Sequence, residues 1–286
     1  MLHFNDTKAC FAAHMGEWLM EPKSGNALLS AIKAGILDRE VNNDPYELRV
    51  IGNIAHISIS GAMMKGASKF GGTTSTVKTR QLIREAKASQ DIAGVFLEIE
   101  SGGGTVAGTK ELADDLDSLA AIKPVHAYIN DVGASAAYWV ASKANKISMN
   151  EMGQAGSIGV VAVVEDTSGA YERQGVKVHV ISTGPLKGAF TEGAEVTDTM
   201  IAEMQERVDD INEVFLSEVV IGRGMDIDDL REIADGRMYN AKQSIELGLV
   251  DAIETREEAF ASLQARIKLN SSRQSLNARL SQSARR

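Results

Sequence analysis

Cysteine is nearly missing from this chain of 286 residues, in which Cys10 is the only one. A lone thiol cannot form a disulfide within the chain, and it rules out a zinc cluster built from cysteines. Basic residues are in the minority, because 30 Lys and Arg stand against 39 Asp and Glu and give a net charge of -9. A general polyanion binder is therefore not expected and no nucleic acid is required, although a local basic segment can still act as an arm.

Long apolar runs are missing as well. The longest uncharged apolar stretch of interest, Met152 to Val164, has 13 residues, whereas a membrane-spanning helix needs about 20. The N-terminus lacks a basic region followed by an apolar one, so we see no secretory signal there. These features predict a soluble, cytoplasmic protein without a membrane span, and the 44% of hydrophobic residues provide a sizeable core.

What the chain does contain is a repeated strand–helix pattern from about residue 47 onward. Short apolar or alternating runs at 94–99, 125–129 and 176–180 are typical of strands, and helical patterns lie between them. Strands separated by helices of this length indicate βαβ units. We therefore expect an α/β fold with a mostly parallel sheet and C-terminal helices.

The C-terminal part departs from this pattern. Residues 198–221 form a long helical pattern whose apolar positions, from Ile201 to Phe215, repeat at a spacing of three and four, which is usual for core or for a subunit interface. From Leu269 onward arginines and serines are frequent and acids are missing, so little there can join a core. We divide the chain into a lead segment (1–46), a main domain (47–267) and a flexible basic tail (268–286).

Three polar segments follow predicted strands, and ligands of α/β sheets bind at the carboxyl ends of strands. The first is residues 100–104, ESGGG, whose glycines allow a ligand to approach the backbone closely. The alternative without a binding role is a flexible turn between strand and helix. A dinucleotide site is a poor fit, because the G-x-G-x-x-G spacing is lacking.

The second segment places Ser135 between Gly133-Ala134 and a pair of alanines, at a predicted strand-to-helix turn. This layout is similar to a nucleophile elbow, although the letters G-x-S-x-G are not matched. Small neighbours allow a sharp turn and leave the hydroxyl reachable. Taken alone, a serine at this place is more often the N-cap of the helix.

The third segment, residues 183–189, carries Lys187 on a loop rich in Gly and Pro, where a lysine is ordinarily a solvated surface charge. A serine nucleophile needs a base, and the five histidines lie in the lead segment or in strand patterns, where structural roles are more usual. A lysine can replace histidine only when it is neutral. The hydroxyl of Ser157, in the turn-like sequence GSIG, can hold such an amine in position.

Taken together and in order, these motifs strongly resemble the signal peptide peptidase A family of serine proteases. The motifs are ESGGG at 100–104, GASAAYW at 133–139, GSIGV at 156–160, Lys187, and a closing segment with ADGRMY at 234–239 and GLVD at 248–251. The likeness covers roughly residues 48–255. It implies a ClpP/crotonase-like spiral fold and a serine protease domain over 47–267.

The resemblance implies an endopeptidase with a Ser/Lys dyad that hydrolyses peptide bonds. By motif, the nucleophile is Ser135, the general base Lys187, the orienting hydroxyl Ser157, and the oxyanion hole the backbone N–H groups of Gly104 and Ala136. Two donors aimed at the oxyanion agree with this chemistry. The sequence departs from the family at Gly102, where a proline is usual and tightens the turn, and at Ala137, where glycine is usual.

The lack of a membrane anchor and the sequence WLMEP at 18–22 resemble the phage capsid-maturation branch of the family. Those proteases act inside the assembling prohead on scaffold and other head proteins. The likeness implies polypeptide substrates, a place in the bacterial host cytoplasm or the prohead, and a homo-oligomer whose site is completed at the subunit interface. It implies no cofactor and no metal, and it makes the basic tail a tether to head proteins or the remnant of a scaffold fusion.

Three alternatives remain open. The first is a cytosolic bacterial homologue that degrades signal peptides, and the second is a non-catalytic capsid assembly module. The third is a crotonase-like acyl-CoA enzyme, which shares a backbone oxyanion hole on the related fold. The sequence shows no obvious pair of carboxylates to act as the base of that reaction.

Overall fold

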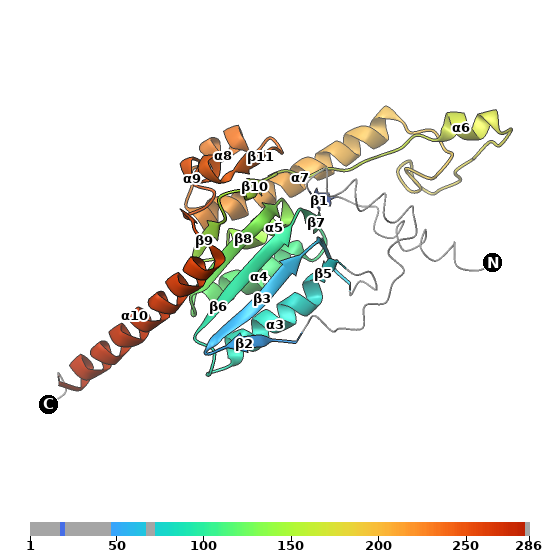
Figure 1. The fold of residues 1–286 in the computed structure, drawn as a ribbon. Coiled ribbons are helices and arrows are strands. Elements are labelled where there is room, and N and C mark those ends of the chain that lie inside the picture. Colours follow the sequence, from blue (N-terminus) through green and yellow to red (C-terminus); the bar gives the residue numbers. More distant parts are fainter. Residues whose placement is uncertain (1–17, 21–46, 67–71, 284–286) are drawn as a thin grey trace.

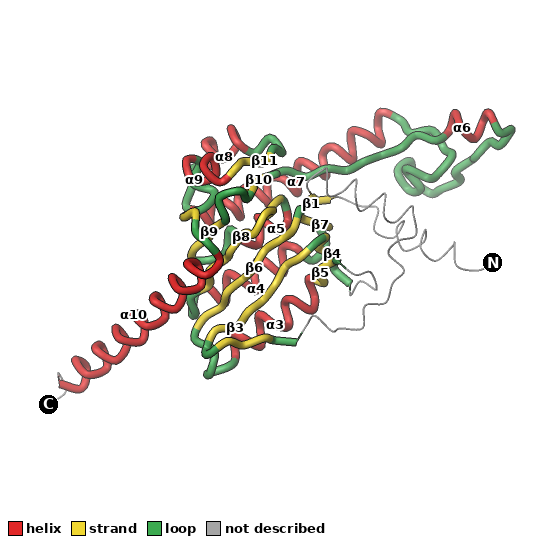
Figure 2. Tube along the Cα trace, viewed as in Figure 1, coloured by secondary structure: helices red, strands yellow, loops and turns green. Residues whose placement is uncertain are grey.

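The computed structural model describes residues 18–20, 47–66 and 72–283, with an α/β body at the centre and two helical extensions (Figure 1, Figure 2). The lead segment predicted for residues 1–46 lies outside the described residues except for 18–20. The division of the chain into three parts therefore stays a prediction.

The described part alternates between strands and helices. The strands are β1 Trp18–Met20, β2 Arg49–Ile51, β3 Ile54–Ser60, β4 Ala62–Met64, β5 Thr73–Ser75, β6 Gly94–Ser101, β7 Gly103–Thr105, β8 Val125–Ala134, β9 Lys146–Met149, β10 Gln154–Gly156, β11 Met238–Asn240 and β12 Ala252–Ile253. The helices are α3 Thr76–Ala88, α4 Thr109–Ala120, α5 Ala136–Ala141, α6 Ser168–Arg173, α7 Asp198–Arg223, α8 Ile227–Ile233, α9 Ala241–Glu246 and α10 Arg256–Ser283.

The main sheet has the strand order β11-β10-β8-β6-β3-β2, and β9 with β12 joins it beside β8. The four central strands β3, β6, β8 and β10 run parallel, whereas β2 and β11 pair antiparallel at the two ends. A parallel sheet of this kind needs helical crossovers, which α3, α4 and α5 supply. The predicted α/β fold with a mostly parallel sheet and C-terminal helices is confirmed.

Helices cover both faces of this sheet (Figure 1). The larger core lies between the sheet and α3, α4 and α5, and it includes alternate residues of β3 such as Ile57 and Ile59. The smaller core lies on the opposite face, where Leu263 and Ile267 of α10 pack with Phe96 of β6. Burial on both faces explains why β6 is a nearly continuous apolar run.

A second, smaller sheet has the order β1-β7-β4-β5, and one residue, Gly102, separates the end of β6 from its strand β7. Here β1 pairs antiparallel with β7, and β4 pairs parallel with β7 and β5. Gly104 lies between β1 and β4, and a Cβ atom there would come within 1.9 Å of the Met63 carbonyl oxygen. Close packing of strands thus requires the glycine at position 104.

The strand predicted at 176–180 is not formed, and this expectation was wrong. Residues 176–180 have no strand assignment, and α6 is the only regular helix between β10 and α7. Val176 and Val180 are exposed, because the segment lies beyond the N-terminal end of α7 and away from the sheet (Figure 1). Apolar alternation alone does not form a strand where no neighbour accepts its backbone hydrogen bonds.

The C-terminal part is also more regular than its composition indicates. Helix α10 runs without a break from Arg256 to Ser283 and extends away from the body (Figure 1). The boundary predicted at residue 268 is not marked by a change of secondary structure, since the sequence from 256 to 283 contains neither Gly nor Pro to end a helix. Within the described ranges, no helix combines the length and the apolar character needed to cross a membrane.

Candidate active site

Ser135 lies at the sharp turn between the end of β8 and the start of α5. Its backbone has φ 52° and ψ -121°, and its side chain makes no capping hydrogen bond to the helix. An ordinary N-cap has extended backbone and accepts a hydrogen bond from the first turn, so the N-cap interpretation does not describe this serine. A non-glycine residue held at positive φ costs about 1–3 kcal/mol, and such residues gather at functional sites.

Ser157 lies next to Ser135, on the neighbouring strand. Strands β8 and β10 are parallel and pair Ala134 with Gly156, so each serine follows a paired residue. The Ser135 N–H donates to the Gly156 carbonyl oxygen at 2.8 Å. Ser157 also has a positive φ, 49°, and is only 5% exposed. The two serines thus share both a location and a strained backbone.

The closing segment holds Ser157 from its other side. The Ser157 N–H donates to the Arg237 carbonyl oxygen at 2.7 Å, and β11 pairs antiparallel with β10 from Gln154↔Asn240 to Gly156↔Met238. Sequence reasoning assigned no role to Arg237. Its place directly before the strand in the sequence ADGRMYN was the available signal.

Gly104 and Ala136 lie on two elements that pack together. β7, which carries Gly104, contacts α5, which begins with Ala136. The register also pairs Ser101 with Gly133, two residues before Ser135. The glycine run therefore lies beside the turn at Ser135.

Ser101 fixes the glycine turn without the usual proline. Its Oγ donates to the Gly61 carbonyl oxygen at 2.6 Å and accepts from the Gly103 N–H at 3.1 Å. Gly103 has φ 103°, a conformation that favours glycine. Sequence reasoning missed this role of Ser101. A serine before a run of glycines was the signal, since its hydroxyl can replace the rigidity that a proline ring provides.

Two buried aromatic residues anchor α5 to the C-terminal part. The Tyr138 hydroxyl donates to the Leu249 carbonyl oxygen at 2.8 Å, and complete burial raises the pKa of this phenol. The ring of Trp139 stacks on Phe215 of α7, with ring centroids 4.8 Å apart and an interplanar angle of 10°. These contacts hold the helix that follows Ser135 between the sheet and α7.

Lys187 is the one predicted site residue that the structure does not bring to this turn. It is exposed, on the segment between β10 and α7. Residues 166–197, here called the lysine arm, close on themselves, since the Val196 and Gly193 N–H groups donate to Asp166 and Thr167. The lysine arm lies beyond the N-terminal end of α7 (Figure 1). Within one chain, Ser135 and Ser157 therefore lie together, and Lys187 lies apart from them on the lysine arm.

The buried histidine His126 does not serve this turn either. Its Nε2 lies 2.7 Å from the Ser148 Oγ and 3.8 Å from a carboxylate oxygen of Glu254, beneath α10. Burial, with a smaller contribution from Lys146, lowers the pKa of His126 to about 4. For His126 this packing agrees with the predicted structural role, whereas His179 is exposed on the lysine arm, where no strand forms.

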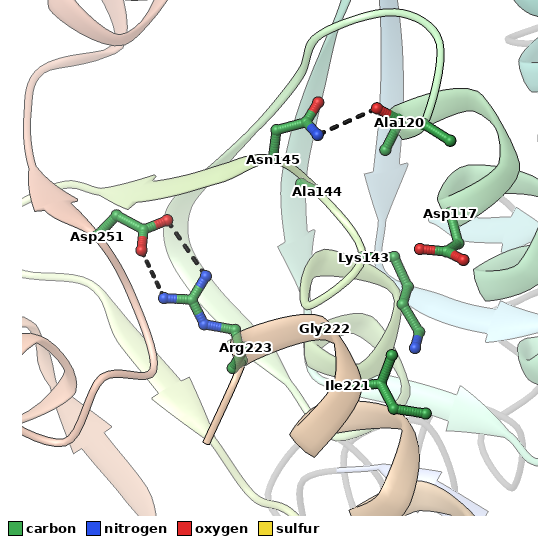
Figure 3. Close-up of a pocket in the computed structure, with 10 residues that line it drawn as sticks. Asp117, Ala120, Lys143, Ala144, Asn145, Ile221, Gly222, Arg223 and Asp251 are labelled. Carbon is green, nitrogen blue, oxygen red and sulfur yellow. Dashed lines mark hydrogen bonds and ion pairs between the residues drawn. The ribbon is translucent and has the colours of Figure 1, made fainter.

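A separate pocket of about 420 Å³ lies at the other end of α5 (Figure 3). It is lined by residues that follow α5, by the end of α4 and by the end of α7, and none of the predicted site residues lines it. In Figure 3, Arg223 is paired with Asp251, and their closest atoms are 2.6 Å apart. Hydrogen bonds from Arg223 and the Ile147 N–H hold the pKa of the Asp251 carboxyl below its usual range, although burial alone would raise it.

Comparison with known protein families identifies the family of this chain. The model of peptidase family S49 matches residues 117–270 of this chain. In the described part of the chain, no group of His, Cys, Asp and Glu side chains is arranged to hold a metal ion.

Several curated proteins are similar in sequence. A putative protease of Synechocystis is 30% identical over 215 residues, which cover 75% of this chain and 74% of that protein. A putative signal peptide peptidase SppA of Enterococcus faecium is 32% identical, over 65% of this chain and 54% of that protein. The capsid assembly protease C of Escherichia phage lambda is 25% identical, over 89% of this chain and 60% of that protein. The chain thus spans less than two thirds of the last two relatives.

Among solved structures, an enoyl-CoA hydratase/isomerase family member is similar. The superposition has a TM-score of 0.47 at 14% sequence identity, and it covers 78% of this chain and 74% of that one.

Proposed function

The chain belongs to peptidase family S49, and from this premise we propose that it is a serine endopeptidase whose nucleophile is Ser135. The observation that carries the proposal is the pair of strained serines. Among the described non-glycine residues, only three have positive φ, and two of these are Ser135 and Ser157. Strain of this kind persists where the surrounding structure fixes a reactive group in place.

The chemistry follows from the neighbours of Ser135. Its Oγ attacks the carbonyl carbon of a peptide bond while a neutral lysine amine accepts the hydroxyl proton. The oxyanion is stabilised by the N–H groups of Gly104 and Ala136, and one such donor is worth about 2.7–4 kcal/mol. The proton then passes to the leaving amine, and water releases the acyl group by the reverse steps.

We assign the base to Lys187 and its orientation to the Ser157 hydroxyl. Because the lysine arm extends away from Ser135 of its own chain, the dyad forms between two copies in a homo-oligomer. Exposed apolar residues support such an assembly, since Ile181 is 97% exposed and Ile201 of α7 is 47% exposed. An interface between copies would remove these apolar side chains from water.

The biological role that we propose is processing of scaffold and head proteins during phage capsid assembly, in the host cytoplasm or the prohead. The similarity to the phage lambda protease covers 89% of this chain, more than the 75% and 65% covered by the two bacterial relatives. On this proposal the protease domain is residues 47–267, and the basic end of α10 tethers the enzyme to its head-protein partners.

A mixing experiment tests the dyad and the assembly together. Ser135→Ala and Lys187→Ala chains are each expected to be inactive on a peptide substrate and to lose fluorophosphonate labelling. When the two are mixed in equal amounts, about one quarter of the sites combine an intact serine with an intact lysine of the neighbour, as in any head-to-tail assembly. Activity should return to that level.

The control is Lys177→Ala, which removes another exposed lysine from the same arm and should leave activity unchanged. An active Ser135→Ala chain would overturn the assignment of the nucleophile. An inactive mixture of well-folded oligomers would overturn the dyad between copies.

A further inference from the structure

The strand β1 occupies an edge that lies directly beside the proposed nucleophile. Its residues pair antiparallel with β7, with Trp18 opposite Thr105, Leu19 opposite Gly104 and Met20 opposite Gly103. On its other side β7 is already paired with β4. Without β1, the strand that carries the glycine run would have a free edge, with backbone N–H and C=O groups open to another strand.

That edge is suited to an extended peptide. A peptide that adds to a sheet edge gains backbone hydrogen bonds along its length. All three residues of β7 are buried, and β7 packs against α5 beside the Ser135 turn. A peptide paired with Gly103 and Gly104 would have its backbone next to the proposed oxyanion donor. One edge accepts one strand at a time, so β1 and such a peptide exclude each other.

We propose that β1 is an internal competitor for the peptide-binding edge of β7, an inference that rests on the proposed endopeptidase function. A polypeptide substrate pairs antiparallel with β7 only after β1 has left. The N-terminal segment around residues 18–20 therefore sets how much of the enzyme is open to substrate. Its backbone direction, from Thr105 toward Gly103, is also the direction that we assign to a bound substrate.

The size of the effect depends on how often β1 is in place. The apparent affinity for a competing peptide is reduced by the fraction of molecules whose edge is free. With β1 paired in nine molecules of ten, a peptide binds about tenfold more weakly than to an open edge. A strand of three residues is short enough to leave without unfolding the body.

The test uses two proline variants of the full chain, Leu19→Pro and Met20→Pro. Successive residues of a strand point their N–H groups to opposite sides, so one variant loses a donor to β7 and the other loses a donor that points outward. The variant that loses the outward-pointing donor is thus a matched control for the variant that loses the donor to β7. Both carry Ser135→Ala, and the probe is a fluorescein-labelled peptide of residues 16–22, GEWLMEP, followed by fluorescence anisotropy.

We expect one of the two variants to bind the peptide about tenfold more tightly than the chain with intact β1. In the corresponding chains with Ser135 present, the same substitution should lower KM by the same factor and leave kcat unchanged. Equal affinity in both variants and in the parent would overturn the inference.

The two proposals fail in different ways. If hydrolysis depends on Ser135 and neither proline variant changes peptide affinity or KM, β1 is not a competitor and the endopeptidase proposal stands. If the peptide binds more tightly to a variant but no chain hydrolyses any substrate, the endopeptidase proposal fails and the edge of β7 is a peptide-binding site without catalysis.

Discussion

The turn at Ser135 is buried and packed on every side, whereas the lysine arm is exposed. We nevertheless assign one residue of the proposed dyad to each of them. Ser135 is 1% exposed and lies between two parallel strands and a helix whose six residues are all buried. Lys187 is exposed on an arm whose hydrogen bonds to Asp166 and Thr167 stay within the arm. On this assignment, the chain pre-organises the nucleophile by itself, and a contact outside its own body sets the position of the base.

Because of this difference, folding of a single chain is not sufficient for activity on our proposal. A strained backbone at the nucleophile is maintained by the packing around it, so that half of the site exists as soon as the body folds. A lysine on an exposed arm has no such support, and it becomes a base only where another surface removes water from it. If the dyad forms between copies as we propose, the enzyme is inactive until it assembles.

The largest effect is expected at the nucleophile. Ser135→Ala should lower kcat/KM for a peptide substrate by at least about 10⁴-fold, because removing a nucleophile leaves only binding and the oxyanion hole. The folded body should keep its unfolding temperature or gain slightly, since the strained turn remains intact. Steady-state kinetics and thermal unfolding of the purified oligomer measure both.

A matched variant at Ser142 shows whether the loss is specific. Ser142 is also buried, and its Oγ donates to the Trp139 carbonyl oxygen at 2.7 Å on the same helix. Ser142→Ala should cost about 1 kcal/mol of stability and retain most of the activity. If Ser135→Ala and Ser142→Ala lose activity equally, the loss is not specific to Ser135, and the assignment of the nucleophile is wrong.

The next effect concerns the packing that joins α5 to α7. Phe215→Ala removes the ring stacked on Trp139 and should lower the free energy of unfolding by about 3–5 kcal/mol, as for other buried Phe truncations. Denaturant unfolding measures the loss. Phe215→Leu keeps most of the apolar volume and should recover a large part of it. An equally unstable Phe215→Leu chain would indicate that stacking, rather than burial, dominates.

Much of the fold could be predicted from the sequence because its periodic patterns reflect burial. The alternation in β3 follows from one buried and one more exposed face, and the apolar run in β6 follows from burial on both faces of the sheet. The alternation at 176–180 has the same form but lies on the lysine arm, where no strand is available to pair with it. Apolar alternation in a sequence indicates which side chains a strand would bury. It does not indicate whether a neighbouring strand is present to pair with it.

The candidate site divides in the same way. Ser135, Ser157 and Gly104 belong to short motifs that carry their own turns, so the sequence places them beside predicted strand ends. The pairing of β1 with Gly104 joins segments more than 80 positions apart, and three residues carry no periodicity from which to predict it. The position of Lys187 depends on a second copy of the chain in our proposal, and a single sequence contains no direct sign of that contact.

Acid is expected to lower the free energy of unfolding by a smaller amount, through the buried side chain of His126. The pKa of His126 is lowered to about 4 by burial, whereas an unfolded histidine titrates near 6.5. Between these values the unfolded chain binds the proton and the folded chain does not, so stability is full above about pH 6.5 and falls as the pH decreases toward 4. The two pKa values correspond to a loss of about 3 kcal/mol over this window.

Urea unfolding between pH 7.5 and 4 measures this slope, and His126→Gln should flatten it. The charged groups around the ring are Lys146 and Arg266, which lower the pKa of His126, and Glu254 and Asp251, which raise it. A slope that remains unchanged in His126→Gln would mean that carboxylates such as Asp251 carry the acid sensitivity instead.

The smallest effect on the folded chain, and the sharpest contrast with Phe215, is expected on the lysine arm. Ile181 is 97% exposed, so Ile181→Ser should change the unfolding free energy of the dilute chain by no more than about 0.5 kcal/mol. If the arm is buried between copies, the same substitution raises the dissociation constant of the oligomer, which sedimentation measures. The control is Ile122→Ser, at a 61% exposed position on the body, which should alter neither quantity. Equal weakening of the oligomer by both variants would remove the arm from the interface and, with it, the route by which Lys187 reaches a neighbouring Ser135.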